Sequence, residues 1–253
     1  MRALILLYGI GCYVVFFLTF LYAIGFVGDL PLPKTIDRPA IAAATGWQAW
    51  IIDLVLLGIF AVQHSGMARR GFKIWLTRWL PTAAERSTYV LLSSLALILL
   101  YWQWRPLAGT VWNAPAGWSV GVLWGLFALG WLLVLSGTFV ISHFDLFGLR
   151  QVWLYARGRK YAPPEFKEGL YYRLVRHPLM LGFLIAFWAT PKMSVGHLLF
   201  SVATTGYILL ALQLEERDLL AAHGESYRDY QRRVPMLCPW PRPRGAVAKR
   251  ART

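Results

Sequence analysis

The feature that most constrains the fold of this chain is a series of four apolar segments, each close to the length that crosses a lipid bilayer. They cover residues 3–27, 47–63, 88–104 and 118–141. A transmembrane helix needs about 20 mostly apolar residues. Only 15% of the residues are charged, against 57% that are hydrophobic, whereas roughly a quarter of a soluble domain is charged. The sequence therefore predicts an all-α, polytopic membrane helix bundle with four full spans.

A fifth apolar region differs from these four because it is interrupted. It runs over residues 179–214 and breaks at residues 190–194, which read TPKMS. Pro191 lacks a backbone N–H, and Lys192 is costly at the centre of a bilayer. We expect a C-terminal helical hairpin, which either returns to the side it entered or makes two tilted crossings. The more polar residues 215–233 predict a cytoplasmic amphipathic helix that begins after the hairpin and is interrupted by Gly224.

The basic residues are concentrated in some connections and scarce in others. The formal net charge is +14. Lys and Arg gather in the second and fourth connections and in the C-terminal tail, and the first and third connections have few. Because inward-facing loops collect Lys and Arg, we expect these basic connections and both termini in the cytoplasm. Membrane topology explains the basic balance better than nucleic-acid binding does, so we expect no nucleic-acid partner.

Tryptophans lie near the ends of the apolar segments. Such residues are typical of the aromatic belts at membrane–water interfaces. We expect them to mark the interface on one side of the membrane: Trp47, Trp50, Trp102, Trp104, Trp112 and Trp118.

Several well-known motifs are absent from the sequence. Its two cysteines, Cys12 and Cys238, form neither a disulfide framework nor a metal-ligand cluster, and we expect no metal. There is no Walker loop, no dinucleotide-binding glycine fingerprint after a strand, and no HExxH or CxxC motif. A soluble Rossmann-type methyltransferase is therefore excluded.

Three polar clusters carry residues that can do chemistry. The first ends in Arg176-His177-Pro178, where the chain enters the hairpin. Pro178 suits the first turn of a helix, and the free N–H groups at a helix start attract an anion. Arg176 and His177 beside that helix start are therefore suited to bind a carboxylate. The alternative is a positive-inside anchor at the start of a helix.

The second cluster is the acidic pair Glu215-Glu216, directly after the apolar region. Membrane anchors at such a position are usually Lys or Arg, so an acidic pair is not an anchor. Ionisable residues at membrane depth tend to be functional. The alternative is the beginning of a solvated helix with Arg217 as a partner.

The third cluster follows the fourth span and contains His143, Asp145, Arg150 and Gln151 in an aromatic-rich stretch. A histidine near an aspartate can support acid–base catalysis, and the alternative is an ordinary interfacial loop. His64 lies at the end of the second span. It is either a catalytic base or a ligand, or an interfacial histidine whose neighbours supply its hydrogen bonds.

Taken together, residues 165–236 resemble the C-terminal signature of the isoprenylcysteine carboxyl methyltransferase-like superfamily. The resemblance implies that S-adenosylmethionine is used inside a membrane fold. At one position the chain departs from the pattern: Met180 stands where the superfamily often has a tyrosine. The matching features are Arg176-His177-Pro178, Gly182, the apolar hairpin, Glu215-Glu216, Tyr227-x-x-Tyr230 and Val234-Pro235.

The chain as a whole is similar to the bacterial methanethiol S-methyltransferases. The likeness implies methyl transfer from S-adenosylmethionine to methanethiol, giving dimethyl sulfide and S-adenosylhomocysteine. It implies an integral protein of the bacterial inner membrane that works at the cytoplasmic face. The segments that carry it are residues 63–69, 85–90, 141–148 and 189–194. We expect a single membrane domain over residues 1–253, with a four-span part (1–141), a cofactor-binding part (142–236) and a basic tail (237–253).

The resemblance also suggests a role for each candidate residue. The cofactor's carboxylate is expected to meet Arg176, His177 or the helix start at Pro178. Glu216, rather than Glu215, is expected to bind its ribose hydroxyls or amino group. Aromatic faces attract a cation, so tyrosines are expected to flank the adenine or the sulfonium, and Gly182 completes the cofactor-binding motif. The tyrosines are Tyr172, Tyr227 and Tyr230.

The thiol substrate must lose its proton to become a nucleophile. We expect His143, oriented by Asp145, to accept this proton, with His64 as the second candidate. A volatile apolar thiol can arrive through membrane lipid, whereas the polar cofactor must come from the cytoplasm.

Three alternatives stay open at this point. The same fold could methylate another thiol, a prenylated cysteine or a small amine. The chain could be a membrane protein without catalysis, of the heme- or denitrification-associated type, but such a protein needs His pairs within the bilayer and the sequence places only His197 there. It could also be an NADPH-dependent sterol-type reductase. The acidic pair and the Arg-His-Pro entry favour the methyltransferase.

Overall fold

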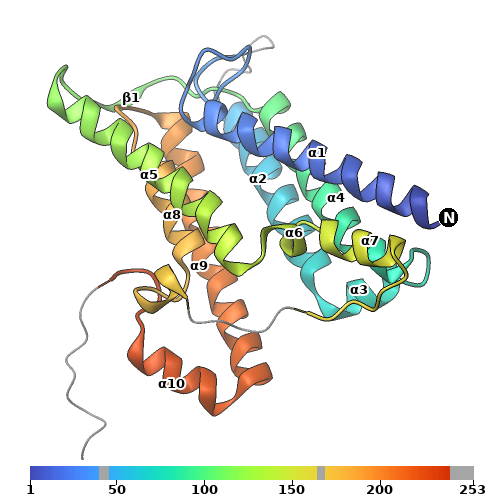
Figure 1. The fold of residues 1–253 in the computed structure, drawn as a ribbon. Helices are drawn as coiled ribbons and strands as arrows, with labels where there is room; N and C mark the ends of the chain where they lie inside the picture. Colours follow the sequence, from blue (N-terminus) through green and yellow to red (C-terminus); the bar gives the residue numbers. More distant parts are fainter. Residues whose placement is uncertain (40–45, 164–168, 240–253) are drawn as a thin grey trace, which may run out of the picture.

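The protein is a bundle of long apolar helices (Figure 1), and the computed structural model describes residues 1–39, 46–163 and 169–239. By length and composition, five described helices can cross a membrane, which confirms the predicted all-α membrane bundle. A sixth apolar helix, α8, is shorter. The long helices are α1 (Arg2–Val27), α2 (Trp47–Ala68), α4 (Thr82–Gln103), α5 (Trp118–Ile141) and α9 (Val195–His223), and α8 covers Pro178–Trp188.

Shorter elements lie at the two ends of this bundle. At one end are α3 (Arg70–Leu76), α6 (His143–Leu146), α7 (Leu149–Ala156), the 3-10 helix η1 (Leu170–Arg173) and α10 (Glu225–Arg233). Because the arginine-rich connections lie here, we call it the basic end. At the other end, the strand end, are β1 (Thr110–Asn113) and β2 (Lys192–Ser194). The predicted basic tail, residues 237–253, falls outside the described residues beyond Pro239.

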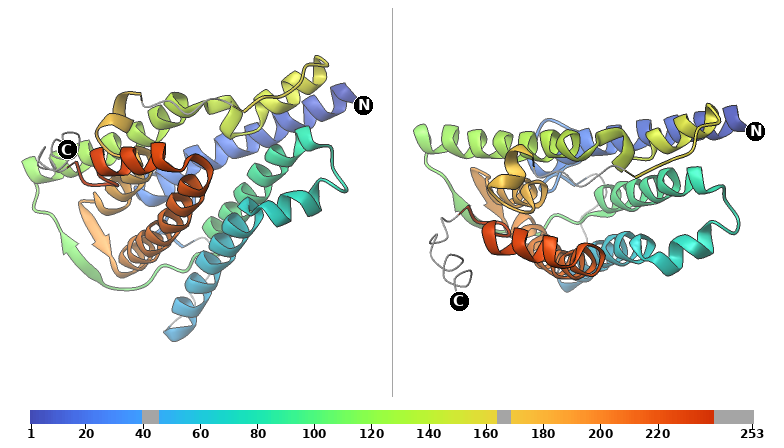
Figure 2. Two further views of the ribbon diagram at one scale, coloured as in Figure 1. Left: turned by 90° about the horizontal axis from the view of Figure 1, so that it is seen from below. Right: turned by 60° about the horizontal axis from the view of Figure 1, so that its bottom comes forward.

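The long helices are arranged in two layers. In the right-hand view of Figure 2, α1 and α5 form one layer, and α2 and α9 lie beneath it. Between the layers, α4 packs against both α1 and α2, and α8 packs against both α5 and α9. The described helices of residues 1–141 and of residues 142–236 therefore pack against each other in one bundle.

The turn of the hairpin α8–α9 lies at the strand end. Strand β2 pairs with the antiparallel β1, which belongs to the connection between α4 and α5, with Trp112 opposite Met193. The Ala114 amide also donates to the Pro191 carbonyl at 2.7 Å. The turn of the hairpin therefore lies at the end of the bundle rather than in its middle, and its lysine, Lys192, is exposed there.

Helix α8 approaches α5 unusually closely because glycines face one another. A Cβ atom added at Gly182 would lie 2.7 Å from the Gly130 carbonyl oxygen, and one added at Gly130 would lie 2.6 Å from the Ala186 amide. Small residues allow such backbone contact between membrane helices. The structure therefore places Gly182, predicted as part of the cofactor motif, in the interface between two helices.

Two sequence predictions about helix ends are wrong. No helix begins at Glu215: α9 continues without a break to His223, and Gly224, with φ +58°, ends it before α10. The acidic pair thus lies in the last turns of α9. Trp104 is not an interfacial anchor, because it is fully buried and its indole N–H donates to the Ile36 carbonyl at 3.1 Å. Trp118, by contrast, is 83% exposed.

Candidate functional site

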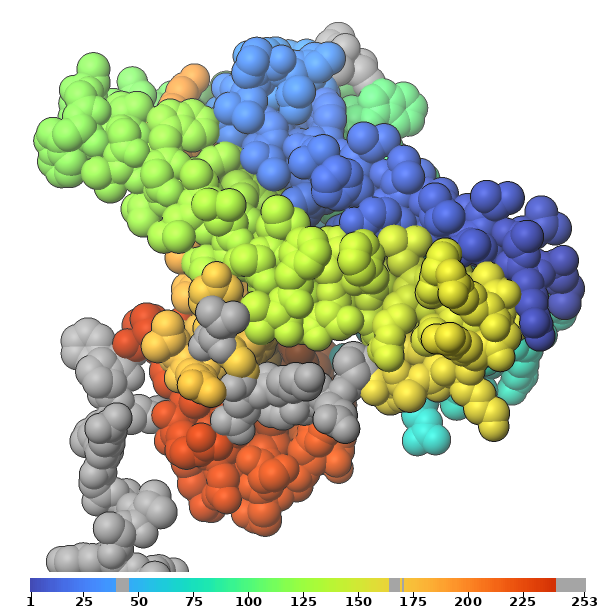
Figure 3. All heavy atoms as spheres, viewed as in Figure 1, coloured from blue at the N-terminus to red at the C-terminus, as the bar shows by residue number. Residues whose placement is uncertain are grey.

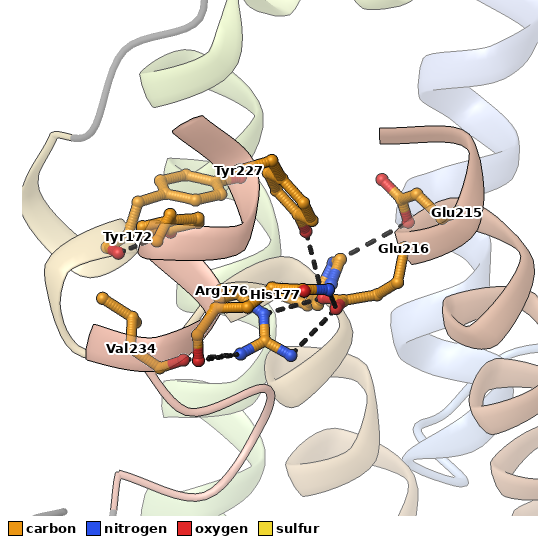
Figure 4. Close-up of polar contacts among 9 residues, drawn as sticks. Tyr172, Arg176, His177, Glu215, Glu216, Tyr227 and Val234 are labelled. Carbon is orange, nitrogen blue, oxygen red and sulfur yellow. Dashed lines mark hydrogen bonds and ion pairs between the residues drawn. The ribbon is translucent and has the colours of Figure 1, made fainter. Parts of the chain in front are cut away.

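The predicted Arg176 and Glu216 meet in a buried ion pair between the start of α8 and the end of α9 (Figure 4). Arg176 Nε lies 2.7 Å from Glu216 Oε1, and Nη2 lies 2.9 Å from Oε2. The side chains are only 8% and 11% exposed. Two parallel hydrogen bonds of this kind are the strongest arrangement that an arginine and a carboxylate can form.

Three other side chains donate to the same carboxylate. His177 Nε2 lies 2.7 Å from Oε1, the Tyr227 hydroxyl 3.0 Å from Oε1, and Gln231 Nε2 2.5 Å from Oε2. Burial, followed by the Glu216 carboxylate, raises the pKa of Tyr227, so its hydroxyl stays protonated as a donor. The Glu216 carboxylate is therefore fully occupied by the protein itself.

Further hydrogen bonds of Arg176 hold the segment that follows α10 in place. Its Nη1 donates to the Val234 carbonyl at 2.6 Å, and its backbone amide donates to the Pro235 carbonyl at 2.9 Å. The buried Tyr230 donates to the Tyr172 carbonyl at 2.6 Å. The cluster thus ties together η1, the start of α8, the end of α9, α10 and residues 234–236.

Glu215 has a different environment from its neighbour. Its side chain is 50% exposed, and its carboxylate lies 3.7 Å from His177 Nδ1, on the other side of the imidazole from Glu216. Burial, followed by the Glu215 carboxylate, raises the pKa of the nearby Tyr172. Glu215 and His177 therefore lie together, and the Glu215 side chain is half exposed.

His143 is buried and both of its ring nitrogens are engaged. The Tyr13 hydroxyl lies 2.8 Å from Nε2, and Thr138 Oγ1 lies 2.8 Å from Nδ1. Thr138 uses its single proton on the Leu135 carbonyl at 2.6 Å, so it accepts from Nδ1–H, and Nε2 accepts from Tyr13. Burial lowers the pKa of His143. This geometry holds a neutral imidazole with a basic Nε2.

The structure does not bring the Asp145 carboxylate to His143, so the predicted pairing is wrong. Asp145 Oδ1 lies 3.0 Å from Arg150 Nη1, and Oδ2 accepts from the Tyr161 hydroxyl at 3.1 Å. Gln151 donates to the Asp145 carbonyl at 3.1 Å. Asp145 lines a separate cavity at the basic end.

His64 is held between α2 and α4. The Tyr89 hydroxyl lies 2.9 Å from its Nε2, and Ser93 Oγ lies 3.2 Å from its Nδ1. Tyr89 belongs to the same apolar cluster as Phe147, whose ring lies 5.0 Å from that of His143. The two candidate bases are thus linked through one aromatic cluster.

Several partners found here were not predicted from the sequence: Tyr13, Thr138, Tyr89, Ser93 and Gln231. Tyr13 lies 130 positions from His143, and nothing in a local pattern could indicate that contact. In residues 1–39, 46–163 and 169–239, no three His, Cys, Asp or Glu side chains converge in a way that would hold a metal ion.

Comparison with known proteins places the chain in a family. The profile of the NnrU protein family matches residues 54–233. The methanethiol S-methyltransferase of Mycobacterium tuberculosis is 60% identical over 242 residues, which are 95% of this chain and 98% of that protein. The protein of the same name from Crocosphaera subtropica is 53% identical over 94% of this chain and 93% of its own.

A more distant relative is nurim of Rattus norvegicus, which is 32% identical over 77% of this chain and 75% of its own. No solved structure matches the chain. The extent of the first two matches confirms the likeness that the sequence segments indicated. The chain therefore belongs to the NnrU protein family, and to the same family as the proteins named methanethiol S-methyltransferase.

Proposed function

We propose that this protein methylates methanethiol to dimethyl sulfide. One observation carries the proposal: proteins named for this activity are 60% and 53% identical to the chain over almost its whole length.

We propose S-adenosylmethionine as the methyl donor, because residues near Glu215 fit its groups. The exposed Glu215 carboxylate can accept hydrogen bonds from ribose hydroxyls or an ammonium group. The ring of Tyr172, on the 3-10 helix η1 that Tyr230 holds in the same cluster, can face an adenine or a sulfonium. Bound here, the cofactor supplies an electrophilic methyl group on sulfur.

Within this site we assign different roles to the two glutamates. Arg176 makes hydrogen bonds to Glu216 and to the carbonyl of Val234. We therefore propose that Glu216 and Arg176 form the structural frame of the site and do not bind the cofactor directly. Glu215 keeps an open carboxylate and is the proposed ligand. This reverses the preference for Glu216 that the resemblance suggested.

We propose that His143 removes the thiol proton with help from Tyr13. As the thiol S–H bond breaks, its proton passes to the Tyr13 oxygen, while the Tyr13 proton passes to His143 Nε2 along the existing 2.8 Å contact. Thr138 keeps the Nδ1 proton in place. The resulting thiolate would form the new C–S bond with its own electron pair, while the bond between the methyl carbon and the sulfonium would break and leave its electrons on the sulfur of S-adenosylhomocysteine.

His64 is a second imidazole with similar contacts to hydroxyl groups. Matched variants of His143 and His64 therefore test which of the two is the base. With His143→Gln we expect kcat to fall about 100-fold with cofactor affinity unchanged. Tyr13→Phe should lower kcat in the same direction, and His64→Gln should leave it within a few-fold. A loss confined to His64→Gln would assign the base to His64.

We propose that the basic end faces the cytoplasm of the bacterial inner membrane and that residues 1–141 and 142–236 form one membrane domain. The arginine-rich connections of that end support this orientation. Cys238 is exposed and Cys12 is buried, so a membrane-impermeant thiol reagent should label inverted vesicles at Cys238. Labelling only of right-side-out vesicles would reverse the orientation.

The activity itself is tested with purified protein in detergent. Given methanethiol and methyl-labelled S-adenosylmethionine, it should release labelled dimethyl sulfide into the headspace. The same assay with larger thiols, prenylated cysteine and small amines measures the substrate range. Absence of any labelled product, together with no cofactor binding by calorimetry, would exclude the methyltransferase function.

A further inference from the structure

We propose that a cavity at the basic end binds the phosphate group of an anionic lipid. The cavity has a volume of about 520 Å³ and lies among α3, the start of α4, α7 and the chain after it. This volume is in the range of small-ligand sites. Its charged lining residues are Lys73, Arg86, Arg159, Lys160, Glu85 and Asp145.

The charge of the cavity favours an anion. Four of these lining residues are cations and two are carboxylates. Asp145 is already paired with Arg150, which does not line the cavity. In the described part of the chain, none of the four cations is within ion-pair distance of a carboxylate. The cavity therefore has positive charge that its own acidic residues do not compensate.

Arg86 is held rigidly at the wall of this cavity. Its Nε donates to the Leu146 carbonyl at 2.9 Å, and its guanidinium carbon lies 5.3 Å from the centre of the Tyr89 ring. These contacts restrain the planar group on one side. Arginine and lysine together are the usual recognition elements for phosphate.

The position of the cavity indicates that the phosphate belongs to a lipid. Helices α3 and α7 lie at the basic end (Figure 1), where α7 packs beside the first half of α1 and the start of α4. Large aromatic side chains in α3, just after it and in α7 are exposed: Trp75 is 51%, Trp79 77% and Trp153 49% exposed. Exposed tryptophans are typical of the headgroup level of a membrane, and basic pockets between helices on the cytoplasmic side bind anionic headgroups.

The cavity is distinct from the proposed cofactor site. None of its lining residues belongs to η1, α8, α9 or α10. Figure 3 shows the yellow α7 on the right of the basic end and the red-orange α10 below and to the left of it. The lipid proposal therefore stands independently of the proposed methyltransferase function.

The test measures lipid binding rather than turnover. Full-length protein is placed in nanodiscs of phosphatidylcholine with or without phosphatidylglycerol, and the retained lipid is counted by native mass spectrometry. Each cation near an anionic headgroup contributes on the order of a fivefold gain in affinity. The double variant Lys73→Gln, Arg159→Gln should therefore bind phosphatidylglycerol on the order of 30-fold more weakly.

The matched control is Arg70→Gln, Arg157→Gln. It removes the same charge from the same two segments, but neither residue lines the cavity. Retention of lipid by the control and its loss by the cavity variant would support the site. An equal loss in both variants would overturn it, since only general surface charge would then be responsible.

Two further arms complete the design. Inorganic phosphate is titrated into protein in phosphatidylcholine alone. Phosphate binding that depends on Lys73 and Arg159, without retention of phosphatidylglycerol, would overturn the lipid source. If thermal unfolding shows that the double variant is not folded, the single variant Lys160→Gln is compared with Arg157→Gln. Equal retention of phosphatidylglycerol by these two variants would also contradict the site.

Discussion

The separation of Glu216 from Glu215 leads to the sharpest prediction. Glu216→Gln keeps the shape of the side chain and removes its charge. Four side chains donate five hydrogen bonds to this carboxylate, and an amide presents only one accepting oxygen. The substitution leaves the Arg176 guanidinium buried beside an N–H₂ group that cannot accept its hydrogen bonds.

The cost of this change follows from the burial of the pair. Arg176 and Glu216 are 8% and 11% exposed, so water screens their interaction little. Removing one partner of a buried ion pair costs about 3–5 kcal/mol. For a chain of this size that lowers the unfolding midpoint by on the order of 10 °C. The measurement is thermal unfolding in detergent, alongside calorimetric titration with S-adenosylmethionine.

Glu215→Gln is the matched control, one position away on the same helix. Since Glu215 is half exposed, we expect its free energy of unfolding to change by less than about 0.5 kcal/mol. Cofactor affinity should fall about tenfold, the effect of losing a hydrogen bond to a charged group. Unchanged stability of Glu216→Gln, combined with lost cofactor affinity, would refute the frame role and make Glu216 the ligand.

The remaining predictions concern packing and pH. Gly182→Ala should destabilise the bundle by about 1–3 kcal/mol because its Cβ meets the α5 backbone. Gly125→Ala should not, since a Cβ at that position has no atom within 4 Å. Equal unfolding midpoints of the two variants would contradict the close contact between α5 and α8. Trp104→Ala should cost about 3–5 kcal/mol and the exposed Trp118→Ala almost nothing, as measured in the same unfolding assay. Burial lowers the pKa of His143, and protonation removes its basic nitrogen, so activity should be lost only as pH falls below the usual histidine value of about 6.5. A loss of kcat/KM that begins above that pH would exclude His143 as the base.

Local sequence was sufficient to predict the spans. Long apolar runs form helices in a membrane because every backbone group must find its hydrogen bond within the segment. The fourth span was predicted at residues 118–141 and α5 covers the same residues. Helices α2 and α4 extend past their apolar runs, to Ala68 and back to Thr82, because polar residues can continue a helix outside the hydrocarbon.

The sequence alone also identified most of the residues that gather around Glu216, although not Gln231. The Arg-His-Pro entry and the acidic pair were recognised as motifs, and the structure brings them within hydrogen-bond distance. Which glutamate points into the cluster was not determined by the motif. Adjacent residues point about 100° apart on a helix, and only the packing of α10 against α9 decides which of the two is buried.

Tertiary structure alone decided the partners of the histidines and the place of Trp104. Asp145 is two positions from His143 but binds Arg150, and the residue that meets His143 is Tyr13 from α1. Proximity in sequence does not fix the direction of a side chain after a helix ends, and Ser142, at φ +159°, turns the chain there. The apolar composition of the segments thus determined the helices, while contacts between helices distant in sequence determined the partners of the polar side chains.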